Sequence, residues 1–257
     1  MPSKRKNSNS LAGLSGKTVM ITGGARRVGA TLARTLHAAG ANIVLHYRRS
    51  SGDAGALAKQ LNAARRGSIA LVQADLLDVG KLPALIDAAL QPFGRLDVLI
   101  NNASSFYPTA VGEITEQDWN DLLGTNLKAP LFLSQAAAPS LRQSQGLILN
   151  LADIHGMRPL RQYTTYCVAK AGLIMLTKSL ARELGPRVRV NAIAPGPVMW
   201  PEAGADKALQ KKIIARTALK RYGSPEDVAR AALFFCTEAP FVTGQILAVD
   251  GGRSVGW

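Results

Sequence analysis

The sequence has little cysteine, with only Cys167 and Cys236 among its 257 residues. The two lie far apart, form no CxxC motif and have no histidine cluster beside them, so the sequence predicts neither a disulfide framework nor a metal site. Cys167 follows Tyr166, but neighbouring side chains on a helix point about 100° apart. We therefore interpret Cys167 as a small packed residue, and two reduced thiols fit a cytoplasmic location.

Long apolar runs and a secretory signal are also missing. No run approaches the roughly 18 residues that a membrane-spanning helix needs. The first ten residues, MPSKRKNSNS, are basic and polar with no apolar segment behind them, unlike a signal peptide. We expect residues 1–14 to be a disordered basic tail, residues 15–257 to be a single domain, and no membrane to be a partner.

Acidic residues are scarce, since 17 Asp and Glu stand against 31 Lys and Arg and give a formal net charge of +14. Such an excess attracts anions, which include nucleic acid, acidic surfaces and phosphorylated or carboxylated small molecules. The basic residues are scattered, and no recognition-helix or RNA-module pattern accompanies them. We therefore expect a small anionic ligand and no nucleic acid, with a basic, non-catalytic binding protein as the alternative from a different class.

The feature that the sequence has in plenty is alternation of short apolar segments with longer amphipathic ones. Strands that are apolar throughout belong to a sheet covered on both faces, and strict alternation with helices implies parallel strands. The sequence predicts an α/β fold, a single Rossmann-type doubly wound parallel sheet of about seven strands with helices on both faces. The expected strands are 18–22, 41–47, 68–75, 96–104, 146–153, 188–196 and 245–252; the expected helices are 28–40, 53–67, 79–94, two stretches across roughly 116–142, 163–185 and 224–236.

A glycine-rich segment, TGGARRVG at 22–29, lies between the first expected strand and helix. Backbone N–H groups and the helix dipole bind phosphate at such a turn. The spacing of Gly23 and Gly29 is wider than in G-x-G-x-x-G, and Arg27 stands where a glycine would be expected. The turn favours a phosphate-bearing cofactor, although a tight turn alone also explains glycines after a strand.

The second expected strand ends in LHYRRSS, with no carboxylate until Asp53. An acidic residue there would favour the 2′-hydroxyl of NAD. Arg27, Arg48, Arg49 and Ser50 would instead surround a 2′-phosphate with charged and hydroxyl donors. The alternative is an exposed basic turn, but arginines in both loops that flank one adenosine site favour NADPH.

Motifs along nearly the whole chain from about residue 15 together resemble the short-chain dehydrogenase/reductase family. They are Gly23, Gly29, Asp75, NNA at 101–103, Asn126, Tyr166-x-x-x-Lys170, PG at 195–196 and VTGQILAVDGG at 242–252. The family generally has serine at the position of Asp153, so the sequence departs from the pattern at one catalytic position.

Four features resemble a subgroup, the pteridine reductases, which includes the dihydromonapterin reductase type. These are Arg27, HYRRS at 46–50, NNASSFYPT at 101–109 and Asp153. The resemblance implies an NADPH-dependent reduction of dihydropterin to tetrahydropterin, with oxidised pterin and dihydrofolate as further candidate substrates. It also implies a homotetramer.

The same resemblance assigns roles to individual residues. It places adenine near Asp75, Ser104 near the pyrophosphate and pterin, and the ring of Phe106 over the pterin. The implied catalytic residues are Asp153, Tyr166, Lys170 and Asn126. The implied cofactor contacts are Gly23, Arg27, Val28, Gly29, His46, Tyr47, Arg48, Arg49, Ser50, Asp75, Leu76, Asn102, Ala103, Ser104, Tyr166, Lys170, Pro195 and Gly196. The candidate substrate contacts are Arg27, Ser104, Phe106, Asp153, Tyr166 and, in the expected substrate loop 198–212, Trp200.

Tyr166 and Lys170 suit proton donation because they lie one helical turn apart. A free tyrosine has a pKa near 10 and donates reluctantly at neutral pH. A neighbouring ammonium favours the phenolate, so we expect Lys170 to make Tyr166 the stronger acid and also to reach the nicotinamide ribose. Tyr163 is followed at that spacing by Cys167 rather than lysine, so we do not expect it to be the donor.

Asp153 argues against a carbonyl substrate. A ketone that receives hydride becomes an alkoxide, and an ionised aspartate offers it no donor and repels it by about 1–4 kcal/mol in a wet site. A pterin C=N takes hydride at carbon and a proton at nitrogen, and its ring N–H and NH₂ groups can donate to a carboxylate. The alternatives are a carbonyl or 3-oxoacyl reductase, or a carboxylate that only caps a loop.

Overall fold

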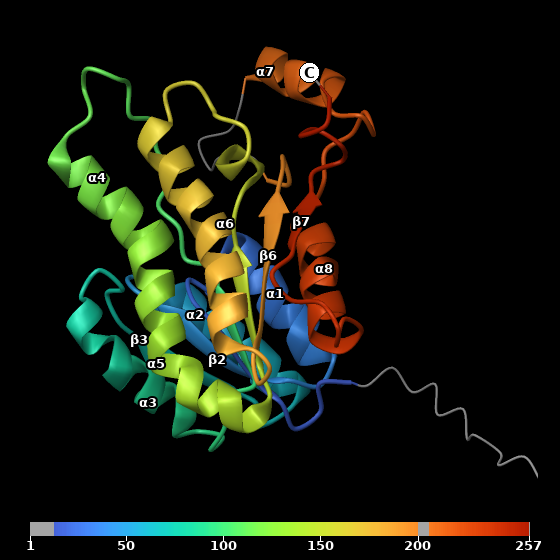
Figure 1. The fold of residues 1–257 in the computed structure, drawn as a ribbon. Helices are drawn as coiled ribbons and strands as arrows, with labels where there is room; N and C mark the ends of the chain where they lie inside the picture. The colour runs from blue at the N-terminus through green and yellow to red at the C-terminus, as the bar shows by residue number, and fades with distance from the viewer. Residues whose placement is uncertain (1–12, 200–205, 257) are drawn as a thin grey trace, which may run out of the picture.

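The computed structural model describes residues 13–199 and 206–256. Its strands form one seven-stranded parallel sheet in the order β3-β2-β1-β4-β5-β6-β7 (Figure 1). The predicted fold class is therefore confirmed. The strands are β1 (Thr18–Ile21), β2 (Asn42–Tyr47), β3 (Ile69–Gln73), β4 (Val98–Asn101), β5 (Leu147–Leu151), β6 (Arg189–Pro195) and β7 (Ile246–Val249).

Helices cover both faces of this sheet. One core layer contains side chains from α1, α2 and α8, and the other contains side chains from α3, α5 and α6. The helices are α1 (Arg27–Ala38), α2 (Ser51–Ala64), α3 (Leu82–Leu90), α4 (Glu116–Leu123), α5 (Ala129–Ser144), α6 (Thr164–Leu184), α7 (Lys207–Ala215) and α8 (Pro225–Thr237), with short turns η1 (Val79–Lys81), η2 (Gly124–Lys128) and η3 (Ile154–Gly156). No helix in the described part of the chain is long and apolar enough to cross a membrane.

The central strands explain why the apolar runs are continuous. Val19 and Ile21 of β1 pack in one core layer, whereas Met20 between them packs in the other. All three are fully buried. Because side chains alternate across a strand, a strand covered on both faces needs apolar residues at every position.

The segment 116–142, predicted as two helical stretches, is one nearly continuous run. Between α4 and α5 the chain makes a five-residue π-helical turn, η2, rather than a break. A π turn inserts an extra residue into the helix and is frequent at functional sites. Here it contains Asn126, which is fully buried.

Two further segments differ from expectation. Residues 207–215, which overlap the C-terminal part of the expected substrate loop 198–212, form α7, and its first turn is capped by the side chain of Asp206, which accepts from the N–H of Ala208. Leu14, assigned to the tail, is buried and donates its N–H to the carbonyl of Ala39 at 2.8 Å. The ordered fold therefore already includes Leu14.

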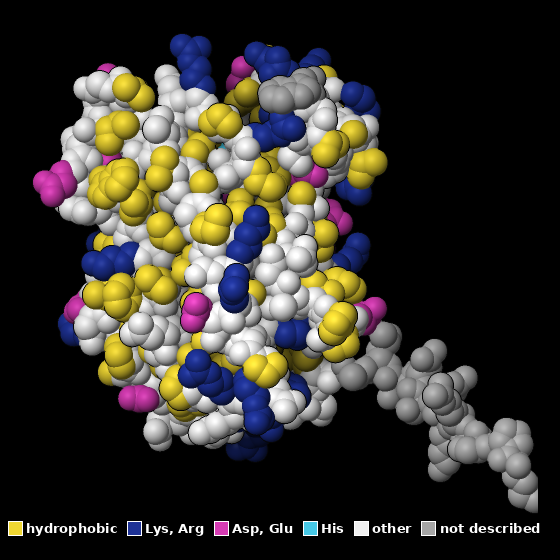
Figure 2. Space-filling view, viewed as in Figure 1, with side chains coloured by type: hydrophobic (Ala, Val, Ile, Leu, Met, Phe, Trp, Pro, Cys, Tyr) yellow, Lys and Arg dark blue, Asp and Glu magenta, His cyan; other side chains and the backbone are white. Residues whose placement is uncertain are grey.

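Basic side chains occupy several separate places on the molecular surface viewed in Figure 2 rather than one continuous patch. This distribution agrees with their scatter in the sequence.

Candidate active site

The turn between β1 and α1 is shaped for close approach of a ligand. A Cβ on Gly29 would lie 2.7 Å from Nδ2 of Asn102 and would collide with the carbonyl oxygen of Gly23. Gly23 has φ +58° and Arg27 has φ +53°, both in the left-handed region that favours glycine. The sequence places Arg27 where a glycine would be expected, and the left-handed backbone at this position explains why glycine is the expected residue.

Asn102 fixes this turn from the end of β4. Its Nδ2 donates to the carbonyl oxygens of Thr22 at 2.8 Å and Gly23 at 3.0 Å. The hydroxyl of Thr22 in turn accepts from the N–H of Asn102 at 2.9 Å and of Ala103 at 3.0 Å. The two loops that would flank a nucleotide are thus joined by four hydrogen bonds.

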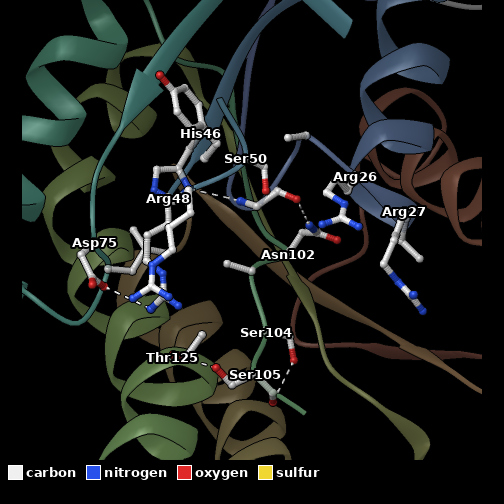
Figure 3. Close-up of a pocket in the computed structure, with 18 residues that line it drawn as sticks. Arg26, Arg27, His46, Arg48, Ser50, Asp75, Asn102, Ser104, Ser105 and Thr125 are labelled. Carbon is white, nitrogen blue, oxygen red and sulfur yellow. Dashed lines mark hydrogen bonds and ion pairs between the residues drawn. The ribbon is translucent and has the colours of Figure 1, made fainter. Parts of the chain in front are cut away.

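A cavity of about 460 Å³ opens at the carboxyl ends of β1 to β4 (Figure 3). All the predicted cofactor residues line it except Tyr166, Lys170, Pro195 and Gly196. Those present are Gly23, Arg27, Val28, Gly29, His46, Tyr47, Arg48, Arg49, Ser50, Asp75, Leu76, Asn102, Ala103 and Ser104. The sequence interpretation missed Ala25, Arg26, Ser105 and Thr125, which complete the lining.

Positive charge dominates this cavity. Its lining contains four arginines, at 26, 27, 48 and 49, and one carboxylate, Asp75. We refer to it as the arginine-rich cavity. Arg48 and Asp75 lie 3.7 Å apart and are both about half exposed, so their attraction is weak. The cation excess and the close-packed glycine turn fit a dinucleotide that carries an additional phosphate.

His46 braces the cavity from within. Its Nδ1 accepts from the N–H of Gly23 at 3.2 Å, so its other nitrogen, Nε2, carries the proton and donates to the carbonyl of Ala74 at 3.1 Å. Burial lowers its pKa to about 4. Both ring nitrogens of the neutral imidazole therefore bind the chain itself, and His46 holds the ends of β1, β2 and β3 together.

Three of the predicted catalytic residues, Asp153, Tyr166 and Lys170, lie close to one another and are not part of the lining of this cavity. Oη of Tyr166 donates to Oδ2 of Asp153 at 2.8 Å, and Oδ1 of Asp153 accepts from the N–H of His155 at 2.8 Å. Nζ of Lys170 donates to the carbonyl of Leu151 at 2.8 Å and lies 5.7 Å from the centre of the Tyr166 ring. Tyr166 and Lys170 are buried.

The expected effect of Lys170 on Tyr166 is wrong. The pKa of Tyr166 lies well above its usual value, because burial disfavours the phenolate and Asp153 adds a negative charge beside it. Burial also lowers the pKa of Lys170 to about 8. The carboxylate of Asp153 is hydrogen-bonded to the phenol, whereas the ammonium of Lys170 is directed to a carbonyl. Of these two neighbours, Asp153 therefore has the larger effect on the pKa of Tyr166.

Asn126 connects the π turn to the loop after β4. Its Oδ1 accepts from Oγ of Ser104 at 2.6 Å, and its Nδ2 donates to the carbonyls of Ser105 and Leu122, each at 2.9 Å. The whole amide is therefore used within the protein. In this arrangement Asn126 positions Ser104 between the arginine-rich cavity and Tyr166.

Phe106 has an aromatic partner that the sequence interpretation missed. Its ring stacks on Tyr163 with centroids 4.6 Å apart and meets the Tyr166 ring edge-on at 4.8 Å. A hydrogen bond of 2.6 Å from the N–H of Thr109 to the carbonyl of Gln162 holds the two loops together. Half of the Phe106 surface remains exposed. No local pattern shows that Tyr163 is near Phe106, since the contact joins two loops distant in sequence.

Pro195 and Gly196, two of the predicted cofactor contacts, lie outside the lining of the cavity, at the end of β6. Gly196 donates its N–H to the carbonyl of Val249 at 3.0 Å, and a Cβ on it would lie 2.6 Å from Cβ of Asp250. The close approach to the segment after β7 accounts for this glycine. Trp200 lies outside the described residues. Among the residues that the structure does describe, no cluster of three or more His, Cys, Asp or Glu could hold a metal.

A family profile described as enoyl-(acyl carrier protein) reductase matches residues 23–254. The chain belongs to the short-chain dehydrogenase/reductase family. Pteridine reductase 1 of Leishmania tarentolae is 38% identical, over 92% of this chain and 96% of the relative. A 3-oxoacyl-[acyl-carrier-protein] reductase of Staphylococcus aureus is 35% identical, over 92% and 97%. A 3beta-hydroxysteroid dehydrogenase 1 of Eggerthella lenta is 36% identical, over 94% and 95%.

As a short-chain dehydrogenase/reductase, the chain is an oxidoreductase that uses a nicotinamide cofactor. Relatives with different substrates in their names match at similar identity. The choice of substrate therefore has to be argued from the side chains around Tyr166.

Proposed function

We propose that this short-chain dehydrogenase/reductase is an NADPH-dependent pteridine reductase. The substrate class is dihydropterin, with oxidised pterin and dihydrofolate as further candidates, and the product is the tetrahydro form. The observation that carries the proposal is the hydrogen bond of 2.8 Å from Oη of Tyr166 to Oδ2 of Asp153. It puts a carboxylate directly beside the group that would face the reacting atom.

This carboxylate separates two reactions by the charge that each develops. Carbonyl reduction builds an oxyanion at the tyrosine hydroxyl, and a carboxylate within a few Å repels it by about 1–4 kcal/mol. Reduction of a ring C=N builds no oxyanion, because the nitrogen is protonated. The ring's N–H donors give the Asp153 oxygens favourable partners instead. A pterin therefore suits this site better than a ketone or a 3-oxoacyl thioester.

The proposed chemistry needs one hydride and one proton for each C=N reduced. NADPH bound in the arginine-rich cavity would supply the hydride to the ring carbon, and the proton would go to the neighbouring nitrogen. Tyr166 holds its hydroxyl proton at neutral pH and can donate it, and its raised pKa makes it a weaker acid than a free tyrosine. Asp153 orients that hydroxyl and accepts from the ring; after Tyr166 has donated, Asp153 can take up a proton from solvent and pass it to Tyr166 through the same hydrogen bond.

The arginine-rich cavity supports NADPH as the form of the cofactor. Arg48 and Arg49 follow β2 at the place where an acidic residue would select the 2′-hydroxyl of NAD. Together with Arg27 and Ser50 they supply charged and hydroxyl donors for a 2′-phosphate. We propose NADPH on that ground, with Lys170 reaching the nicotinamide ribose.

We also propose a cytoplasmic homotetramer. The proposal rests on the resemblance to pteridine reductases, and large apolar side chains exposed on α6, Val168 and Met175, are compatible with a partner copy. Light scattering of the purified chain would give its mass in solution.

The decisive experiment measures NADPH oxidation with dihydrobiopterin, dihydromonapterin, dihydrofolate and simple ketones in parallel. In Asp153→Ser we expect kcat/KM for the dihydropterin to fall about 100-fold or more, because the proton route is cut. The matched control is Asp87→Ser, an exposed aspartate on α3, which should behave as wild type.

A carbonyl reductase would give the opposite pattern. It would turn over ketones but no pterin, and Asp153→Ser would leave its activity unchanged or raise it. That result would overturn the proposed function.

A further inference from the structure

A cavity of about 310 Å³ opens at the amino ends of β5 and β6, so it lies at the opposite end of these strands from Asp153 and Pro195. Lys and Arg side chains gather in the lower part of the molecule in Figure 2, where Figure 1 shows the turn between α6 and β6. Three segments line the cavity: Gln145 before β5, then Pro186, Arg187 and Arg189 at the start of β6, and Cys236, Thr237, Ala239 and Pro240 at the end of α8.

Arg189 is a partly buried cation whose hydrogen bonds all go to backbone carbonyls. Its Nη1 donates to the carbonyls of Ala239 at 3.0 Å and Val242 at 3.4 Å, and its Nη2 donates to the carbonyl of Phe235 at 3.0 Å. Burial lowers the pKa of this guanidinium, but an arginine stays protonated at neutral pH. Carbonyl groups carry no net charge, so the positive charge of Arg189 is hydrogen-bonded but not neutralised.

The cavity supplies no opposite charge of its own. Its lining contains no Asp or Glu, and Arg187 and Arg189 form no salt bridge with any residue that the structure describes. Glu238 is exposed and is not part of the lining. Burial raises the pKa of the Cys236 thiol to about 12, so this side chain also stays neutral. The walls therefore carry positive charge without a counter-ion from the described chain.

Arg187 adds a second guanidinium that is not engaged. Its side chain is exposed and forms no hydrogen bond or ion pair with the described residues, so it can turn toward a ligand. Two guanidinium groups on one cavity repel each other, and an anion between them would be attracted by both. Their planar donor pairs also match the oxygens of phosphate and carboxylate groups.

We propose that this cavity, the α8 anion site, binds a small oxyanion with at least two negative charges. Phosphate and carboxylate groups share the chemistry that the two guanidinium groups recognise. The site is independent of the proposed pterin and NADPH sites, because it lies at the other end of the strands and shares no lining residue with the arginine-rich cavity.

The test is a calorimetric titration of the NADPH-saturated protein with pyrophosphate and, separately, with citrate, at constant ionic strength. NADPH is present so that the arginine-rich cavity is filled. In Arg187→Gln we expect Kd to rise about tenfold or more, as for loss of a charge-assisted hydrogen bond. Because Arg187 makes no bond within the described chain, the variant should fold, and an unchanged Tm without anion would verify this.

The matched control is Arg66→Gln, which makes the same change in net charge. Arg66 is exposed and lies beside β3, at the far edge of the sheet from β6 and β7, so Kd should stay within about twofold of wild type. Weaker binding of pyrophosphate alone in Arg187→Gln would identify a phosphate ligand, and of citrate alone a carboxylate ligand.

Three results would overturn the α8 anion site. They are the same Kd in wild type and Arg187→Gln, the same loss of affinity in Arg187→Gln and Arg66→Gln, and no binding of either anion to the NADPH-saturated wild type. None of them bears on the reduction of pterins, which is measured by NADPH oxidation. The proposed function and this site therefore fail in separate experiments.

Discussion

Phe106 is a half-exposed aromatic ring between Tyr163 and Tyr166. One of its faces is already covered by Tyr163, so the ring is fixed before any ligand binds. A fixed flat surface loses little conformational freedom when a planar heterocycle packs on it. Tyr163, which the spacing to Lys170 excluded as a proton donor, therefore has a positioning role in the proposed site.

We predict that Phe106→Ala raises KM for dihydropterin about tenfold, since stacking and apolar contact are lost, and changes KM for NADPH less than about twofold. Steady-state kinetics with each substrate varied in turn would measure both constants. Phe241→Ala, which removes a fully exposed ring before β7, is the control. Equal changes in the two KM values would argue against stacking on the pterin.

At the scale of elements, the π turn η2 is what brings Asn126 inward from an otherwise regular helical run. The five-residue turn lies between α4 and α5, and the Asn126 amide makes three hydrogen bonds there, to Ser104, Ser105 and Leu122. The loop that carries Phe106 is therefore fixed to this helical run by Asn126, and Oγ of Ser105 adds a hydrogen bond of 3.3 Å to Oγ1 of Thr125. The geometry of the loop depends on the turn.

We expect Asn126→Ala to lower the free energy of unfolding by about 1–3 kcal/mol, because buried polar partners lose their bonds. It should also lower kcat more than it raises KM for NADPH, because Ser104 and Phe106 shift relative to Tyr166. Urea unfolding and steady-state kinetics would measure the two effects. Asn120→Ala, exposed on α4, should stay within about 0.5 kcal/mol of wild type. Lost stability with unchanged kcat would show a structural role only.

Particular residues show what the sequence could and could not predict. The continuous apolar segments predicted the parallel sheet, and the residues of the turns that follow the strands predicted most of the lining of the arginine-rich cavity. Local patterns did not show the contact between Phe106 and Tyr163, which joins distant loops, or the π turn, which keeps helical periodicity on both sides. The direction of the Tyr166 pKa shift was missed because it depends on burial and on which neighbour forms the hydrogen bond.

At the scale of the whole molecule, His46 links three neighbouring strand ends of the sheet. Its neutral ring accepts from Gly23 after β1 and donates to Ala74 after β3. Burial lowers the pKa of the folded-state imidazole to about 4. An unfolded chain has an ordinary histidine pKa near 6.5, so it binds more protons than the folded chain between these values. This contribution to stability is complete above about pH 6.5 and is lost as the pH falls toward 4.

We therefore predict that wild type loses about 2 kcal/mol more stability than His46→Gln between pH 7 and pH 5. The glutamine keeps an acceptor and a donor but does not titrate. Urea unfolding at both pH values would give the four free energies. The same loss in wild type and variant would assign the acid sensitivity to other groups, among which His37 also has a pKa lowered by burial.

Arg27 keeps a left-handed backbone, at φ +53°, that glycine would adopt without strain. A non-glycine residue there costs about 1 kcal/mol or more of folding free energy. The guanidinium group that this residue adds at the arginine-rich cavity has no counterpart in a glycine. The turn is thus a place where stability and the proposed affinity for a phosphate-bearing ligand oppose each other, and selection for a more stable chain would act against the positive charge that Arg27 adds.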